Sequence, residues 1–161
     1  MFRTLARELA PSLSIIFQQS FYTGRLASTW RLAAVVPIFK KGDRHVASNY
    51  RPVSLTCVPC KVMEGLIREV MEKHMRKFNL WSYYQHGFRA KRSTVTALLS
   101  SYTDYINCFE HKEDVDIILF DFAKAFDAVN HELLNHKLSM FGLSDGIRSW
   151  IADFVSNRQQ I

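Results

Sequence analysis

The stretch DIILFDFAKAFDAVNH, residues 116–131, joins a strand-like apolar run to two carboxylates, Asp121 and Asp127. Its apolar run from Ile117 to Phe120 is typical of a strand covered on both faces of a sheet, and it ends on a carboxylate, Asp121. Polar groups at the carboxyl end of such a strand lie where open sheets bind ligands. A buried carboxylate needs a cation beside it, because burial alone would neutralise it. We therefore expect residues 114–121 to form a core strand and Asp121 to bind a cation such as Mg²⁺.

Charge is distributed unevenly along the chain. Residues 1–100 carry 16 Lys and Arg against 5 Asp and Glu, whereas residues 101–161 carry 5 against 10, so the net charges are +11 and −5. This imbalance fits a protein that holds a polyanion with one region and cations with the other. Solvated surfaces would produce the same imbalance, so charge alone leaves both interpretations open. The 161 residues, 48% of them hydrophobic, suffice for one globular domain or a large part of one.

The cysteines and the hydropathy pattern limit the compartment and the partners. Three cysteines, Cys57, Cys60 and Cys108, form an odd set without a disulfide pattern, which predicts a reducing intracellular compartment, nucleus or cytoplasm. Cys57 and Cys60 form a CxxC pair, but no second pair follows at zinc spacing, so structural cysteines are favoured over a metal site. No signal peptide and no run long enough to span a bilayer are present, so no membrane partner is expected.

Strand-like and helix-like patterns alternate along the chain, which indicates an α/β or α+β domain. Pro52 restricts its strand to a sheet edge, because proline cannot donate a ladder hydrogen bond. Ser93 is expected to cap the helix that follows it. We expect a helix from Pro11 to Gly24, strands at 31–39 and 49–56 joined by a basic turn at 40–43, and helices at 61–78, 94–108, 131–140 and 145–155.

Four blocks of the chain, in this order and spacing, resemble the reverse transcriptase of non-LTR (LINE-type) retrotransposons. They are WRLAAVVPIFKKGDRHVASNYRPVSLT (30–56), HGFRAKRST (86–94), FDFAKAFDAVNHELLNHKL (120–138) and NRQQ (157–160). Several separate blocks in register arise by chance far more rarely than any single motif. The resemblance implies an α/β (α+β) fold, with the fingers and the first part of the palm of a right-hand polymerase and an incomplete sheet.

The resemblance also implies roles for residues of the palm. Asp121 matches the first palm aspartate, which binds the catalytic Mg²⁺ ions, and the main-chain carbonyl of Phe122 matches a further ligand. Phe126 matches the aromatic gate that rejects a 2′-hydroxyl, so deoxynucleotides would be preferred. Asp127 is expected to have a structural role instead, capping or salt-bridging the segment that follows it.

Basic residues of the fingers receive roles in the same way. Lys41 and Arg51 match the residues that hold the incoming triphosphate, and Lys40 is an alternative to Lys41 because the alignment of a double lysine can slip. Lysine as a point charge and arginine as a fork both suit phosphates. Without the resemblance, a solvated hairpin tip would be the simpler explanation. The block that supports the template strand is matched by Arg89, Lys91 and Arg92.

The implied organisation is a helical lead-in at residues 1–20 and a partial reverse transcriptase domain at 21–161, with fingers at about 21–110 and the start of the palm at about 111–161. The later palm block with paired aspartates does not occur in these residues, and two-metal catalysis needs carboxylates from both blocks. We therefore expect a retrotransposon RNA-directed DNA polymerase domain, truncated before that block, whose partners are an RNA template, a DNA primer and deoxynucleoside triphosphates. The alternatives are a catalytically inactive remnant that at most binds RNA or DNA, and an interaction module without a nucleic-acid role.

Overall fold

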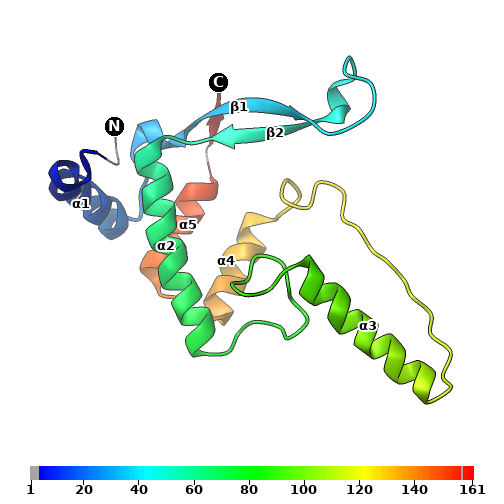
Figure 1. Ribbon diagram of the computed structural model, residues 1–161. Coiled ribbons are helices and arrows are strands. Elements are labelled where there is room, and N and C mark those ends of the chain that lie inside the picture. The colour runs from blue at the N-terminus through cyan, green and yellow to red at the C-terminus, as the bar shows by residue number, and fades with distance from the viewer. Residues whose placement is uncertain (1–3, 157) are drawn as a thin grey trace. The chain divides into compact units, whose positions relative to one another are not determined.

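Helices and one small sheet make up the computed structural model, which describes residues 4–156 and 158–161 (Figure 1). Residues 1–3 of the predicted lead-in and Asn157 of the last motif block lie outside the described residues. The chain forms two compact units: one joins residues up to His74 with those from Asn130 onward, and the other is Met75–Val129. The mixture of helices with a small mixed sheet confirms the predicted fold class. The predicted domain boundaries stay a prediction.

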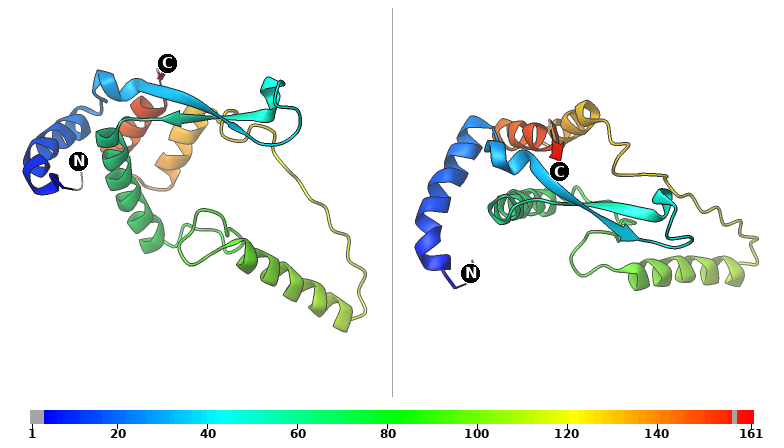
Figure 2. Two further views of the ribbon diagram at one scale, coloured as in Figure 1. Left: turned by 45° about the horizontal axis from the view of Figure 1, so that its top comes forward. Right: turned by 90° about the horizontal axis from the view of Figure 1, so that it is seen from above.

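The sheet of the first unit is built on a β-hairpin. β1 (Leu32–Phe39) pairs antiparallel with β2 (Tyr50–Leu55), and the two strands form a twisted ribbon (Figure 2). β3 (Gln159–Gln160) adds to the other edge of β1 in parallel, which gives the order β2-β1-β3. The structure therefore confirms both predicted strands and the edge position of Pro52. The two-residue strand β3 was not predicted, because it carries no alternating pattern.

Trp150 stands at the centre of the core of this unit. Its side chain is 2% exposed, its indole N–H donates to the Ser20 hydroxyl at 3.1 Å, and its ring stacks on Phe154. The surrounding helices are α1 (Ala6–Thr23), α2 (Val58–Lys77), α4 (His131–Met140) and α5 (Asp145–Val155). The other buried apolar side chains of this cluster are Leu26, Trp30, Cys60, Met63, Ile67, Leu138, Leu143 and Ile147. Helical spacing of apolar residues predicted α2, start and stop signals predicted α4 and α5, and the structure confirms all three.

The first helix starts earlier than the sequence predicted. The structure places Pro11 inside α1, which already begins at Ala6, so the predicted start at Pro11 is wrong. The fixed φ of proline is compatible with a helix, and the chain before it can be helical at the cost of one hydrogen bond. The predicted end is confirmed: Gly24 adopts a φ of +63°, and its amide donates to the carbonyl of Phe21 at 3.2 Å.

An arginine–aspartate pair ties α5 to the chain that enters β1. Nη2 of Arg31 donates to both carboxylate oxygens of Asp153 at 2.7 Å, and the amide of Leu26 donates to Oδ2 of Asp153 at 2.7 Å. Burial by itself raises the pKa of Asp153, but these hydrogen bonds and the nearby positive charge outweigh it, so that pKa lies below its usual value. The carboxylate is therefore ionised at neutral pH and holds both partners.

The second unit contains a loop, the helix α3 (Thr94–Glu110) and an irregular segment that reaches Val129. Ser93 caps α3 as predicted: its hydroxyl accepts from the amide of Thr96 at 3.2 Å, and the Thr96 hydroxyl accepts from the Ser93 amide at 2.8 Å. Within Met75–Val129, His86 is the one buried residue. The local order of this unit therefore depends on hydrogen bonds and ring contacts more than on a core.

The strand predicted at residues 114–121 is not formed. These residues have no regular secondary structure and are all exposed, with Leu119 at 91% and Phe120 at 86%. Figure 1 shows them as an irregular trace after α3. Apolar β-formers favour an extended backbone, but a strand requires a partner, and β1, β2 and β3 pair only among themselves. The prediction of a covered core strand is therefore wrong for this structure.

Candidate functional site

The hairpin carries the first group of predicted site residues, Lys40, Lys41 and Arg51, which are all exposed. The amide of Lys40 donates to the carbonyl of Asn49 at 2.8 Å, so the ladder continues one pair beyond the end of β1. Arg51 lies opposite Ile38. Opposite residues share a face and every second residue along a strand returns to it, so Lys40 and Arg51 lie on the same face. Lys41 lies in the bend that follows.

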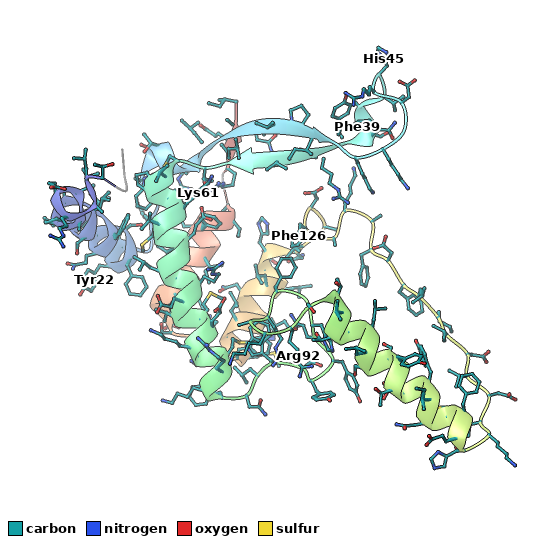
Figure 3. All side chains as sticks on the ribbon, viewed as in Figure 1. Tyr22, Phe39, His45, Lys61, Arg92 and Phe126 are labelled. Atoms are coloured by element: carbon teal, nitrogen blue, oxygen red, sulfur yellow. The ribbon has the colours of Figure 1, made fainter. Side chains whose placement is uncertain are left out.

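Hydrogen bonds hold the loop between β1 and β2 in one shape, and Figure 3 labels Phe39 and His45 at this end of the hairpin. The carbonyl of Asp43 accepts from the Asn49 side-chain amide at 2.8 Å, and the Tyr50 hydroxyl donates to the carbonyl of Arg44 at 2.8 Å. Rings of Phe39 and Tyr50 meet edge to face at 5.5 Å, and the Arg44 guanidinium lies over Phe39. The lysines are therefore presented by a fixed loop.

The basic loop of the second unit holds Arg89, Lys91 and Arg92. Nη1 of Arg89 donates to the carbonyl of Ser82 at 2.8 Å and to that of Gln85 at 3.3 Å, while its guanidinium lies over the Trp81 ring. Arg92 lies over the Tyr83 ring, 5.4 Å from its centroid. Lys91 is exposed, with a φ of +63°. Arg89 therefore fastens the loop, and sequence reasoning gave it no such role.

The segment after Asp121 is a turn in the same unit. Asp121, Phe122 and Phe126 are all exposed, the last at 80%. The amide of Ala128 donates to the carbonyl of Lys124 at 3.0 Å, which closes one turn. Phe126 meets Phe88 edge to face, with ring centroids 6.2 Å apart. Phe88 belongs to the block HGFRAKRST and Phe126 to the block FDFAKAFDAVNHELLNHKL, so this contact joins two of the motif blocks.

Asp127 does not have the structural role predicted for it. The side chain of Asn130 caps α4 instead, with its Oδ1 accepting from the amide of Leu133 at 3.0 Å. Asparagine adjoining the first helical residue is better placed for this bond than an aspartate three residues earlier. Among residues 4–156 and 158–161, the structure shows no ion pair for Asp127. The carboxylate is exposed to solvent.

The residues present do not by themselves fit a magnesium pair. Within the part of the chain that the structure describes, no three His, Cys, Asp or Glu side chains gather where they could hold a metal ion. Asp121 and the Phe122 carbonyl amount to a fragment of a ligand set, and two-metal sites need further carboxylates. Cys60 of the CxxC pair is a core residue, and burial together with a hydrogen bond to Glu64 raises its pKa to about 12. It is therefore a protonated thiol.

The sequence reasoning passed over the aromatic residues of the basic loop. Tyr83, Tyr84 and Phe88 are exposed, and Trp81 lies beside Arg89. The signal was the density of rings, four of them in residues 81–88, immediately before the cations. Aromatic rings interleaved with cations are typical of surfaces that bind single-stranded nucleic acid.

Comparison with known protein families identifies the family of this chain. The family model described as reverse transcriptase (RNA-dependent DNA polymerase) matches residues 38–161. The chain belongs to the reverse transcriptase family. The matched span of this reverse transcriptase chain takes in the hairpin loop, the basic loop and the turn after Asp121.

Several curated relatives of the reverse transcriptase chain are named as proteins of transposable elements. It is 28% identical over 127 residues to a probable RNA-directed DNA polymerase from transposon BS, and 29% identical over 138 residues to one from transposon X-element, both of Drosophila melanogaster. It is 22% identical over 134 residues to a retrovirus-related Pol polyprotein from the type-1 retrotransposable element R2 of Popillia japonica. These alignments cover 78%, 84% and 83% of the chain, but 14%, 15% and 18% of the relatives. The resemblance to non-LTR reverse transcriptases is confirmed, and the chain spans a small part of the length of these relatives.

Across the residues that the structure describes, none of the helices combines the length and the apolar character that crossing a bilayer requires.

Proposed function

We propose that this reverse transcriptase chain supplies the fingers and the opening part of the palm of an RNA-directed DNA polymerase that copies retrotransposon RNA. The observation that carries the proposal is the family match over residues 38–161. Names of the relatives support it, because they describe RNA-directed DNA polymerases of transposons. Phosphoryl transfer depends mainly on positioning and on stabilising charge, so a fixed basic hairpin is a part that such an enzyme requires.

The hairpin is proposed to hold the triphosphate of the incoming deoxynucleotide. Arg51 would bind phosphate oxygens as a fork, together with Lys41 or Lys40 as a point charge. The shared face of Lys40 and Arg51 favours Lys40, because two cations on one face can reach one polyphosphate. The loop hydrogen bonds support this role, since fixed cations lose less conformational entropy on binding.

The turn after Asp121 is proposed to contribute to the palm. Asp121 and the main-chain carbonyl of Phe122 would be its share of the metal ligands, with further carboxylates needed to complete the site. A divalent metal would supply charge stabilisation to the transferred phosphate. The exposed ring of Phe126 would lie under the sugar and exclude a 2′-hydroxyl, and its edge contact with Phe88 limits where the ring can lie.

Template contacts are proposed for the basic loop. Lys91 and Arg92 would neutralise phosphates of the RNA template or the DNA primer, whereas Arg89 would act on the same strand chiefly by holding the loop in shape. For the isolated 161 residues, a second candidate function is nucleic-acid binding without catalysis. It is favoured by the lack of a three-ligand metal cluster among the described residues.

The deciding experiment is Mg²⁺-dependent primer extension on an RNA template, with the isolated chain and with a full-length polymerase that contains it. We expect no deoxynucleotide incorporation by the isolated chain. In the polymerase, Asp121→Asn should abolish synthesis, because a metal ligand is lost. Asp127→Asn is the matched control: it removes an exposed carboxylate six residues away and should leave synthesis nearly unchanged. Normal synthesis by Asp121→Asn would refute the metal-ligand role, and incorporation by the isolated chain would refute the binding-only function.

A further inference from the structure

We infer that the loop from Trp81 to Arg92 is a stacking platform for single-stranded nucleic acid, on which bases lie against the rings of Tyr83 and Tyr84. The inference rests on the proposed function, because a polymerase must hold an unpaired template strand. It adds a second kind of contact, with bases, to the phosphate contacts proposed for Lys91 and Arg92.

Exposed aromatic rings are concentrated in this loop. Tyr83 is 66% exposed, Tyr84 77% and Phe88 87%. The first two rings meet edge to face at 5.4 Å with planes 86° apart, so their faces point in different directions and the rings do not stack on each other. Every base has a flat π-face, and stacking on an aromatic side chain requires no particular sequence. The platform would therefore accept any template base.

The charge around the rings fits a polyanion. From Trp81 to Arg92 the sequence has three Lys and Arg residues and no Asp or Glu. Arg92 is in direct contact with one of the rings, since its guanidinium lies 5.4 Å from the centroid of Tyr83. A cation beside a stacking ring can reach the phosphate of the nucleotide whose base is stacked. A surface built only for apolar protein packing would not need this concentration of positive charge.

Local bonds keep the platform in one conformation although little of it is buried. Arg89 joins the carbonyls of Ser82 and Gln85, and Nδ1 of His86 shares a hydrogen bond with the Thr96 hydroxyl at 2.8 Å. These bonds fasten the loop to itself and to the start of α3. Rings presented by a fixed loop bind with a smaller loss of conformational entropy.

Two non-glycine residues of the loop also have positive φ angles. Phe88 has a φ of +58° and Lys91 a φ of +63°, a region that non-glycine residues seldom occupy. Such conformations cost free energy and concentrate at sites of function. The ring of Phe88 is exposed to solvent and makes an edge-to-face contact with the ring of Phe126.

Fluorescence anisotropy of the full 161-residue chain tests the platform. The probes are labelled oligoadenylates, as RNA and as DNA, and an abasic oligonucleotide of the same length that keeps the phosphates but has no bases. Tyr84→Leu should weaken binding of both oligoadenylates about tenfold and leave binding of the abasic strand unchanged. Tyr84→Phe keeps the π-face and should retain wild-type affinity.

Tyr22→Leu is the matched control, because Tyr22 is 83% exposed on α1, in the other unit. It should bind all probes like the wild type, and circular dichroism should show that every variant is folded. Equal affinity of wild type and Tyr84→Leu for oligoadenylate, equal weakening on the abasic strand, or no binding by the wild type would each overturn the platform. The binding results can be distinguished from a failure of the proposed function. If Asp121→Asn abolishes synthesis while Tyr84→Leu binds oligoadenylate normally, the polymerase role is supported and the stacking platform is refuted.

Discussion

Arg89 and Arg92 are three residues apart in one basic loop, yet their guanidinium groups have different partners. Arg89 donates to two backbone carbonyls, while Arg92 lies over an exposed tyrosine ring. The sequence could indicate only that both are cations near a turn, since side-chain partners depend on where the loop backbone goes. A shared motif therefore does not imply a shared role.

Asp153 allows a prediction about stability. Asp153→Asn keeps the shape of the side chain but removes the charge that Arg31 and the Leu26 amide contact. We expect the free energy of unfolding at neutral pH to fall by about 2 kcal/mol, as measured by urea denaturation. The pKa of Asp153 is lowered in the folded state, so its contribution is complete above the unfolded-state pKa of about 3.9. That contribution is lost as the pH falls below this value towards the folded pKa, and the two proteins should then converge.

The control for this prediction is Asp145→Asn. The side chain of Asp145 is 90% exposed, and its partner Arg148 lies one helical turn away. An ion pair whose carboxylate lies in solvent contributes little, so the loss should be about 0.5 kcal/mol or less. Equal destabilisation by the two substitutions would show that the Asp153–Arg31 pair contributes no more to the free energy of unfolding than the Asp145–Arg148 pair does.

At the scale of elements, the hairpin depends on one glycine. Gly42 has a φ of +90°, and a Cβ at this position would lie 2.7 Å from the side-chain nitrogen of Asn49. That nitrogen donates to the carbonyl of Asp43 and so holds the loop. We expect Gly42→Ala to cost about 2 kcal/mol and to weaken triphosphate binding, which urea denaturation and nucleotide titration would measure.

Gly65→Ala is the matched control for the hairpin. Gly65 lies inside α2, and a Cβ there would meet no atom within 4 Å. Alanine should stabilise the helix by about 0.5–1 kcal/mol. An equal or larger loss at Gly65 than at Gly42 would contradict the view that the loop geometry requires glycine.

Most elements could be predicted from local patterns, and the two errors about strands share a cause. Periodic apolar residues indicated α2, start and stop signals indicated α4 and α5, and turn residues between two β-branched runs indicated the hairpin. Apart from the early start of α1, the errors were the strand at residues 114–121 and the absence of β3 from the prediction. Both concern which strand pairs with which, and strand pairing is decided by contacts distant in sequence.

At the scale of the whole molecule, buried side chains are distributed unequally between the two units. The core around Trp150 belongs to the first unit, whereas the second unit buries His86 alone within Met75–Val129. Hydrogen exchange should reveal this difference. Amides of α5 and β1 should exchange slowly, while those of residues 114–122, which have no described backbone hydrogen bonds, should exchange near the rate of an unfolded chain.

Amides of α3 provide the internal comparison. They are hydrogen-bonded in a helix without buried residues, so intermediate protection is expected for them. Protection at residues 114–122 equal to that of β1 would contradict the structure, because it would require a paired strand there.

The family, the hairpin, the existence of the main helices and the types of residue at the site could be inferred from the sequence alone. These follow from periodicity, turn chemistry and the order of motif blocks, which are properties of neighbouring residues. The tertiary structure alone decided that Arg89 fastens its loop, that Asn130 rather than Asp127 caps α4, and that Phe88 meets Phe126. It also decided that the apolar run before Asp121 is unpaired and exposed. The physical reason is that hydrogen bonds and burial depend on which distant segments meet, whereas propensity acts only along the chain.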